Sequence, residues 1–212
     1  MFVRKQKNKI AVFLSVLVVA SIAIYCKVAI NFREVLVLDL SDIEQMNIGS
    51  EMPKLLYADK KSAIMQGTFG IVVYSFSNSK VTDRISQKQL KSYGLVMPYA
   101  TVSQDGSAIY IRDHNKNGAK NLTYLEYSIS TREMKKISQQ PVDLFTPILI
   151  KTPGYNEQYD KYFDFHYLIN DTIVEVDNSF IYLRANSDWS MKSLQIIICK
   201  YSDSTSNVYN VF

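Results

Sequence analysis

The sequence predicts an all-β fold of about three antiparallel, four-stranded repeat units behind an N-terminal transmembrane helix. Three observations lead to this fold class. The first is an apolar run at residues 10–26, bordered on both sides by basic residues. The second is the enrichment of the remaining chain in Tyr, Ile, Val and Phe, which favour strands. The third is a pair of short motifs that occurs three times in the same order.

Residues 10–30 are predicted to form a transmembrane signal-anchor, preceded by a cytoplasmic basic segment at residues 1–9. At about 1.5 Å per residue, residues 10–26 reach about 25 Å and residues 10–30 about 31 Å, which matches a hydrocarbon core of about 30 Å. Four basic residues precede the run and two follow it, so the N-terminus is expected in the cytoplasm and residues 34–212 outside it. These basic residues are Arg4, Lys5, Lys7, Lys9, Lys27 and Arg33.

Two other interpretations of this segment stand beside the anchor. A cleaved signal peptide would use the small residues Ser21 and Ala23 near the cut. A lipoprotein would use Cys26, but Tyr25 is larger than the small residue usual before a lipidated cysteine. All three interpretations place the rest of the chain outside the cytoplasm. With an uncleaved anchor, the protein is expected to be a single-pass protein of the cell membrane.

The positive charge of the chain is concentrated in this segment. The sequence holds 24 Lys and Arg against 20 Asp and Glu, and residues 1–33 contain six of the basic residues and no acidic one. The exported part therefore has 18 basic against 20 acidic residues, so no nucleic-acid partner is predicted. Beyond Cys26 the sequence has one cysteine, Cys199, so no disulfide is expected within the exported part and its stability must come from packing.

The internal repeat consists of two motifs. The first is an acidic turn that leads into an apolar strand, and the second is a Tyr-Ser pair. Because their order is kept, we expect Ile64, Ile109 and Ile181 to occupy equivalent, buried positions on strands. The first motif begins at Asp59, Asp105 and Asp177, and the second at Tyr74, Tyr127 and Tyr201.

Each unit is predicted to form four successive short strands separated by turn residues. Four antiparallel strands per unit predict a propeller-like extracytoplasmic domain at residues 54–212. The strands are expected at residues 54–58, 62–66, 70–76 and 81–85 in the first unit, at 100–103, 107–112, 122–128 and 134–137 in the second, and at 172–176, 179–185, 194–201 and 207–212 in the third.

Residues 34–53, before the repeats, are predicted to form a juxtamembrane strand and a short helix. A second short helix is expected between the first two units. In both places a Ser is followed three residues later by Glu or Gln, the capping box that starts a helix. The pairs are Ser41 with Glu44 and Ser86 with Gln89, and the expected helix ends are Gly49 and Gly94.

Residues 102–110 resemble the Ser-x-Asp-Gly strand-turn-strand signature of WD40-like and TolB-like β-propellers, and the resemblance extends over about residues 54–212. Residues 53–59 and 70–74 are also similar to the exported region associated with β-lactam-sensor-type membrane metallopeptidases of Gram-positive bacteria. The zinc-binding His-Glu-x-x-His motif of those peptidases is absent from this sequence, so the similarity implies an accessory or sensory role. Three units are fewer than the four or more blades of a closed propeller, which implies an open stack of sheets, pairing with another protein, or a truncated relative.

Other motifs suggest chemistry but have simpler interpretations. Residues 113–118 match the opening of a calcium loop, but the bidentate acid needed at its twelfth position is replaced by Tyr124, so we expect a polar hairpin loop in which Asp113 tolerates alanine. The Ser-x-x-Lys spacing of Ser77 and Lys80 falls in a predicted hairpin turn. The two histidines, His114 and His166, do not predict a metal site or a catalytic triad. No catalytic residue, metal or cofactor is predicted.

The candidate ligand-binding residues lie in the acidic and aromatic segment at residues 155–167. Aromatic rings with polar tips can stack against a sugar or a peptide, although the same composition also suits sheet packing next to a solvated loop. The candidate residues are Tyr155, Tyr159, Asp160, Tyr162, Asp164 and His166.

These observations predict a membrane-anchored extracytoplasmic binding or sensor protein, or an accessory scaffold, of the cell envelope. Its expected partners are the membrane, through residues 10–30, and a protein or envelope component. The alternative is an envelope enzyme or enzyme fragment that acts on glycans or peptides through residues 155–167. We expect a binding protein rather than an enzyme, because the sequence shows no catalytic constellation.

Overall fold

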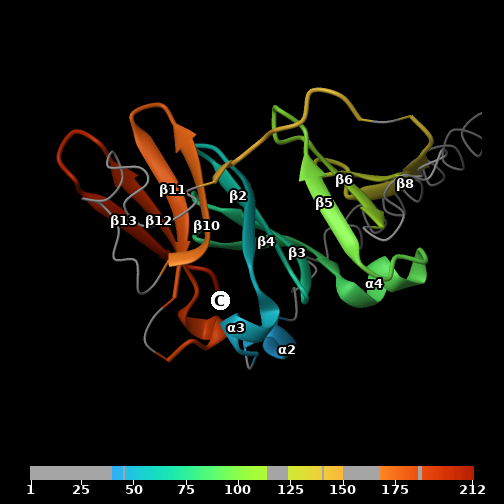
Figure 1. Cartoon of the computed structure of the whole chain (residues 1–212), viewed down its shortest axis with the longest axis horizontal. Coiled ribbons are helices and arrows are strands. Elements are labelled where there is room, and N and C mark those ends of the chain that lie inside the picture. Colours follow the sequence, from blue (N-terminus) through green and yellow to red (C-terminus); the bar gives the residue numbers. More distant parts are fainter. Residues whose placement is uncertain (1–39, 45, 114–123, 140, 150–167, 186–187) are drawn as a thin grey trace, which may run out of the picture. The chain divides into compact units, whose positions relative to one another are not determined.

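A computed structural model describes residues 40–44, 46–113, 124–139, 141–149, 168–185 and 188–212 (Figure 1). The chain divides into two units, Met1–Val37 and Leu38–Phe212, and all described residues belong to the second. The predicted signal-anchor and the candidate ligand-binding segment at residues 155–167 lie outside the described residues. Within the described ranges, no helix is both long and apolar enough to cross a membrane.

The described part is mostly β, as predicted, and contains three antiparallel sheets. Sheets 1 and 2 each have four strands in chain order, and sheet 3 has the order β13-β12-β11-β10-β9. Sheet 1 comprises β1 (Lys54–Ala58), β2 (Ser62–Gly67), β3 (Gly70–Ser75) and β4 (Lys80–Ser86). Sheet 2 comprises β5 (Pro98–Val102), β6 (Ala108–Asp113), β7 (Tyr124–Ser128) and β8 (Glu133–Ile137). Sheet 3 comprises β9 (Ile148–Leu149), β10 (Leu168–Val176), β11 (Ser179–Arg184), β12 (Gln195–Lys200) and β13 (Ser206–Asn210).

Short helices cover the ends of the sheets. The helix predicted after Ser86 is confirmed as α4 (Gln87–Ser92): the Ser86 side chain accepts from the Gln89 backbone N–H, and the Gln89 side chain accepts from the Ser86 N–H. Gly94 follows it with φ +81°. Gly49 does not end a helix, because Asn47 caps a new one there. The other helices are α2 (Ser41–Glu44), α3 (Ile48–Glu51) and the 3-10 turn η2 (Met191–Ser193).

One backbone hydrogen bond recurs in all three sheets and fixes their alignment. It joins the residue just before the second strand of the unit to the residue just after the third strand. The bonds are Phe76 N–H to Lys61 O (2.9 Å), Ile129 N–H to Ser107 O (3.0 Å) and Tyr201 N–H to Asn178 O (3.1 Å). Three residues further on, the backbone has positive φ each time, at Ser79, Arg132 and Ser204.

This alignment corrects the predicted repeat in its third unit. Tyr201 occupies the position of Phe76 and Ile129, two residues beyond Tyr74 and Tyr127, and so lies in a turn rather than in a strand. The turn before the second strand of this unit also differs, because Val176 pairs directly with Ser179 across the two residues Asp177 and Asn178. In the first unit, Ala58 pairs with Ala63 across four residues.

The alignment also shows that one of the three isoleucines is not equivalent to the other two. Ile64, Ile109 and Ile181 are all fully buried, as predicted, with exposures of 0%, 0% and 1%. Ile64 and Ile181 are equivalent, since each lies three residues after the carbonyl of the recurring bond. Ile109 lies two residues after it and is therefore on the opposite face of its sheet.

The sheets pack in a constant sense. We call the face that carries Ile64, Tyr110 or Ile181 the front, and the face that carries Ala63, Ile109 or Phe180 the back. The front of sheet 3 packs on the back of sheet 1 in one core cluster, and the front of sheet 1 packs on the back of sheet 2 in a second cluster (Figure 1). A third cluster of buried residues, with Phe180 and Cys199, lies on the back of sheet 3.

A buried polar link joins sheets 1 and 2. The Tyr127 hydroxyl donates to the carboxylate of Asp83 at 2.5 Å, and Asp83 is buried. Arg132 donates to the Thr82 carbonyl at 3.0 Å, with its Nε 3.7 Å from Asp83. Burial and the Asp83 carboxylate raise the pKa of Tyr127, so the hydroxyl keeps the proton that it donates.

The Ser-x-Asp-Gly sequence forms a tight turn between β5 and β6. Asp105 accepts from the Ser103 hydroxyl at 2.7 Å and from the Ser107 backbone at 3.0 Å, and Gly106 has φ +73°. These hydrogen bonds lower the pKa of Asp105 from 3.8 to about 2. The Gly is required because a Cβ at this position would lie 2.5 Å from the Tyr57 ring. The motif therefore has a structural role in the turn.

Candidate ligand-binding groove

The residues singled out by sequence fall in three kinds of place. Tyr155, Tyr159, Asp160, Tyr162, Asp164 and His166 lie outside the described residues, as do Asn115 and Asn117 of the calcium-like loop. Ser77 lies in the turn between β3 and β4, as predicted. Asp113 contradicts the prediction of a solvated loop position: it is 5% exposed and accepts a hydrogen bond from the Val96 N–H at 3.1 Å. It is therefore a buried structural acceptor.

The described residues show no metal centre and no exposed thiol. They contain no group of three or more His, Cys, Asp or Glu side chains arranged to hold a metal ion. Cys199 is buried, and burial raises the pKa of its thiol, which disfavours the reactive thiolate.

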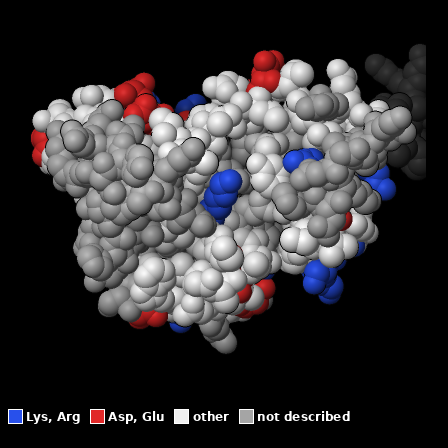
Figure 2. Space-filling model, in the orientation of Figure 1, with Lys and Arg blue, Asp and Glu red and all other residues white. Residues whose placement is uncertain are grey.

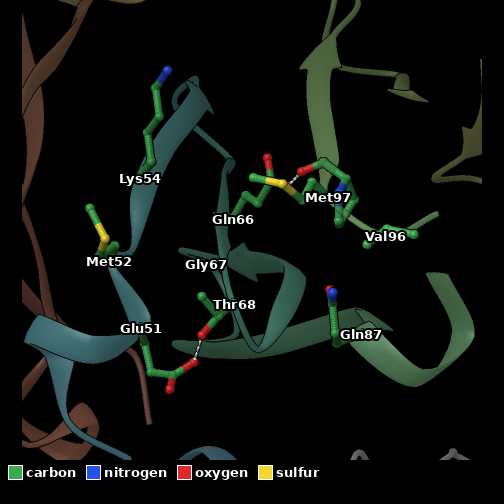
Figure 3. Close-up of a pocket in the computed structure, with 10 residues that line it drawn as sticks. Glu51, Met52, Lys54, Gln66, Gly67, Thr68, Gln87, Val96 and Met97 are labelled. Atoms are coloured by element: carbon green, nitrogen blue, oxygen red, sulfur yellow. Dashed lines mark hydrogen bonds between the residues drawn. The ribbon is translucent and has the colours of Figure 1, made fainter. Parts of the chain in front are cut away.

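A groove lies instead between the first strands of sheets 1 and 2, and we call it the β1–β5 groove. It has two hollows, of about 330 Å³ and 230 Å³, and Lys54 lines both. The first hollow is lined by Glu51, Met52, Gln66, Gly67, Thr68, Gln87, Val96, Met97 and Pro98 (Figure 3). The second is lined by Leu56, Tyr99, Ala100, Thr101, Leu144, Phe145, Thr146, Pro147 and Leu149.

A side-chain amide of β2 joins sheet 1 to β5 beside the groove. Gln66, on β2, donates to the Pro98 carbonyl at 2.8 Å and accepts from the Ala100 N–H at 3.1 Å. The amide thus pairs with the edge of β5 as a neighbouring strand would. Since both bonds are made by one side chain, the spacing between sheets 1 and 2 is fixed where the hollows meet.

Local backbone structure sets the walls of the first hollow. Met52 adopts φ +46° at the end of α3, and its N–H donates to the Ile48 carbonyl, so the chain turns there into β1. On the neighbouring β2–β3 turn, Thr68 donates from its backbone to the Glu51 carbonyl at 3.0 Å and from its hydroxyl to the Glu51 carboxylate. The carboxylate at this end of the hollow therefore already has a hydrogen-bond donor (Figure 3).

Exposed apolar side chains gather along the groove. Ten large apolar side chains of the described residues are exposed, and five of them line the two hollows: Met52, Val96, Met97, Tyr99 and Leu149. Single exposed apolar residues need no explanation, but a contiguous group around a hollow is typical of an interaction site. The groove therefore has the character of a binding surface.

The middle of the groove is positively charged. Lys54 Nζ lies 6.0 Å from the centroid of the Tyr99 ring, and Arg112 Cζ lies 5.1 Å from it. No carboxylate of the described residues forms an ion pair with Lys54. Figure 2 shows a basic side chain in a hollow of the face that is drawn there. This arrangement attracts an anionic group.

One polar atom in the first hollow lacks a partner. Gln87 Oε1 is buried and accepts no hydrogen bond within the described part of the chain. Gln87 is the first residue of α4, and its side chain extends into the hollow (Figure 3). A buried acceptor without a donor costs about 1–3 kcal/mol, so a ligand N–H at this place would remove a penalty.

Sequence reasoning did not find this groove, because its residues come from the edges of strands in different repeat units. One signal was present. A methionine precedes a proline at the start of both β1 and β5, in Met52-Pro53 and Met97-Pro98. Proline is common at the first residue of a strand, so each methionine lies just outside the sheet. Comparison with known proteins adds no relative: no protein-family model matches the chain, and no curated protein matches it.

Proposed function

We propose that the chain is a membrane-anchored extracytoplasmic binding protein of the cell envelope, a sensor or an accessory scaffold, and that it binds its partner in the β1–β5 groove. The single observation that carries this proposal is the gathering of exposed apolar side chains around two hollows with a lysine between them. The described residues offer no comparable group of nucleophile, base and oxyanion donors, so binding is favoured over catalysis.

We also propose that the three sheets form an open, propeller-like arc. Two features support it. Sheets 3, 1 and 2 pack front to back in the same sense, as blades do, and the first strands of the units, β1, β5 and β10, lie together. The last unit packs against the first, which is the contact that closes a propeller ring.

The front of sheet 2 carries polar side chains, which supports the proposal that sheet 2 is the last sheet of the arc on this side. Where sheet 1 has Ile64 and sheet 3 has Ile181, sheet 2 has Tyr110, followed across the sheet by Glu126 and Lys135. Glu126 and Lys135 form an ion pair at 2.8 Å. A polar outer face is typical of a terminal repeat that meets water, so an open stack is favoured over a truncated ring.

The anchor and its orientation follow from the charges around residues 10–26. In intact cells, external protease is expected to remove the chain beyond Arg33 and to leave a tag at the N-terminus protected. Neutral replacements of Arg4, Lys5, Lys7 and Lys9 should weaken this orientation, because the basic residues hold the N-terminus inside. Protection of the C-terminal part in cells whose outer surface is fully accessible to the protease would contradict the orientation.

Site-specific crosslinking in cells tests the binding proposal. A photoreactive amino acid at Met97 or at Leu149, on the two hollows, is expected to capture the same partner. The matched controls are Val208 and Trp189, which are apolar and similarly exposed but do not line the groove. Capture is measured by mass spectrometry of the crosslinked bands. Equal capture from the control positions, or no capture from either hollow, would contradict a partner in the groove.

A further inference from the structure

We infer that the β1–β5 groove takes an extended peptide segment of a partner protein, with an acidic side chain between two apolar side chains. This inference rests on the proposed function and adds the chemistry of the partner. Three parts of the groove support it: the lysine, the two hollows and the buried amide oxygen of Gln87.

The acidic side chain is placed by Lys54. This residue lines both hollows, lies over the Tyr99 ring at 6.0 Å and has no carboxylate partner among the described residues. Arg112, which pairs with Tyr99 across β5 and β6, lies 5.1 Å from the same ring but lines neither hollow. The nearby acid, Glu51, is already hydrogen-bonded to Thr68 and lines the first hollow only. A carboxylate in the middle of the groove is therefore expected to be attracted by Lys54.

The apolar side chains are placed by the hollows on either side of Lys54. Met52, Val96 and Met97 surround the first, and methionine side chains adapt to different apolar shapes. Leu56, Phe145 and Leu149 surround the second. In an extended peptide, every second side chain points to the same face, about 6.5–7 Å apart. The expected pattern is therefore apolar, any residue, acidic, any residue, apolar.

A peptide suits the groove better than a sugar or a bilayer. An extended peptide presents backbone N–H groups along its length, and Gln87 Oε1 is a buried acceptor that lacks one. The surface that the first hollow presents is more apolar than polar, which suits the apolar side chains of a peptide better than the hydroxyl groups of a sugar. A flat bilayer surface would not enter two hollows that lie between the first strands of sheets 1 and 2.

The test uses the full chain in detergent micelles and a library of fluorescein-labelled nonapeptides. Each peptide has Leu, Ile or Phe at positions three and seven and Glu at position five. Matched libraries carry Gln or Lys at position five, and a scrambled library has the same composition in other orders. Binding is measured by fluorescence anisotropy for the pools and for the ten best members.

The Glu peptides are expected to bind about tenfold tighter than their Gln forms, a difference of about 1.4 kcal/mol, because only the Glu carboxylate is attracted by the Lys54 ammonium. Lys54→Gln should abolish this preference, and Lys54→Arg should keep it. Met97→Ser should weaken all peptides, while Val208→Ser, outside the groove, should change none. The preference should also fall as salt rises.

Equal binding of the Glu, Gln and Lys libraries, or of the scrambled library, would overturn the inference. A second copy of the chain as the occupant would also overturn the inference. In that case the chain would self-associate in analytical ultracentrifugation, Met97→Ser would abolish the self-association, and the self-associated form would not bind the peptides. If crosslinking at Met97 captures a partner while no acidic preference is found, the binding proposal stands and the peptide chemistry is wrong.

Discussion

Replacing Ile64 by alanine in the full chain is expected to lower its free energy of unfolding by about 2–5 kcal/mol, a large share of a typical total of about 5–15 kcal/mol. Ile109→Ala and Ile181→Ala should have effects of the same size. All three side chains are fully buried: Ile64 and Ile109 belong to the cluster between sheets 1 and 2, and Ile181 to the cluster between sheets 3 and 1. Alanine removes three carbon atoms and leaves a cavity that neighbouring strands cannot close.

Urea unfolding in detergent, followed by the fluorescence of the single tryptophan, Trp189, measures these changes. Val208→Ala is the matched control, because Val208 is half exposed on the edge strand β13. It should change the unfolding free energy by no more than about 0.5 kcal/mol. If the Ile variants lose no more than the control, the sheets do not pack through these faces.

The strands were predictable because each is short, rich in β-branched or aromatic residues and bounded by turn residues. The expected first strand, residues 54–58, coincides with β1, and most other boundaries differ by one or two residues. It was harder to predict which residues of the three units occupy equivalent positions and face the same side of their sheets. In unit two, Ile109 lies two residues after the carbonyl of the recurring hydrogen bond, whereas Ile64 and Ile181 lie three residues after it. One residue of shift moves a side chain to the other face.

Features that depend on distant contacts were not predictable. β9 has two residues, too few for an alternating pattern, and its pairing with β10 spans a long stretch of sequence. Asp113 looked like a loop residue because of the polar residues that follow it, yet its carboxylate is held by the backbone of Val96, from another segment. The β1–β5 groove arises in the same way: Gln66 and Pro98 meet because sheets 1 and 2 pack, and no local pattern encodes that meeting.

A second large effect is expected at Gly70, at the start of β3. Gly70→Ala should lower the free energy of unfolding by about 2–4 kcal/mol. The backbone there has φ +115°, which residues with a side chain rarely adopt, and a Cβ would lie 2.1 Å from the Ile85 carbonyl oxygen. Relief of this contact requires β4 to move away from β3, with which it pairs at Gly70 and Ser86.

The same substitution should weaken peptide binding in the groove. Ser86, which pairs with Gly70, caps α4, and the next residue, Gln87, lines the first hollow. Urea unfolding measures the stability change, and anisotropy with the Glu peptide library measures the effect on binding. Gly94→Ala is the matched control: Gly94 also has a positive φ, +81°, but a Cβ there meets no atom within 4 Å. Its expected cost is about 1–2 kcal/mol, from backbone conformation alone, with peptide binding unchanged. Equal costs at the two glycines would show that the contact with Ile85 contributes nothing and that α4 is not held in place through β3 and β4.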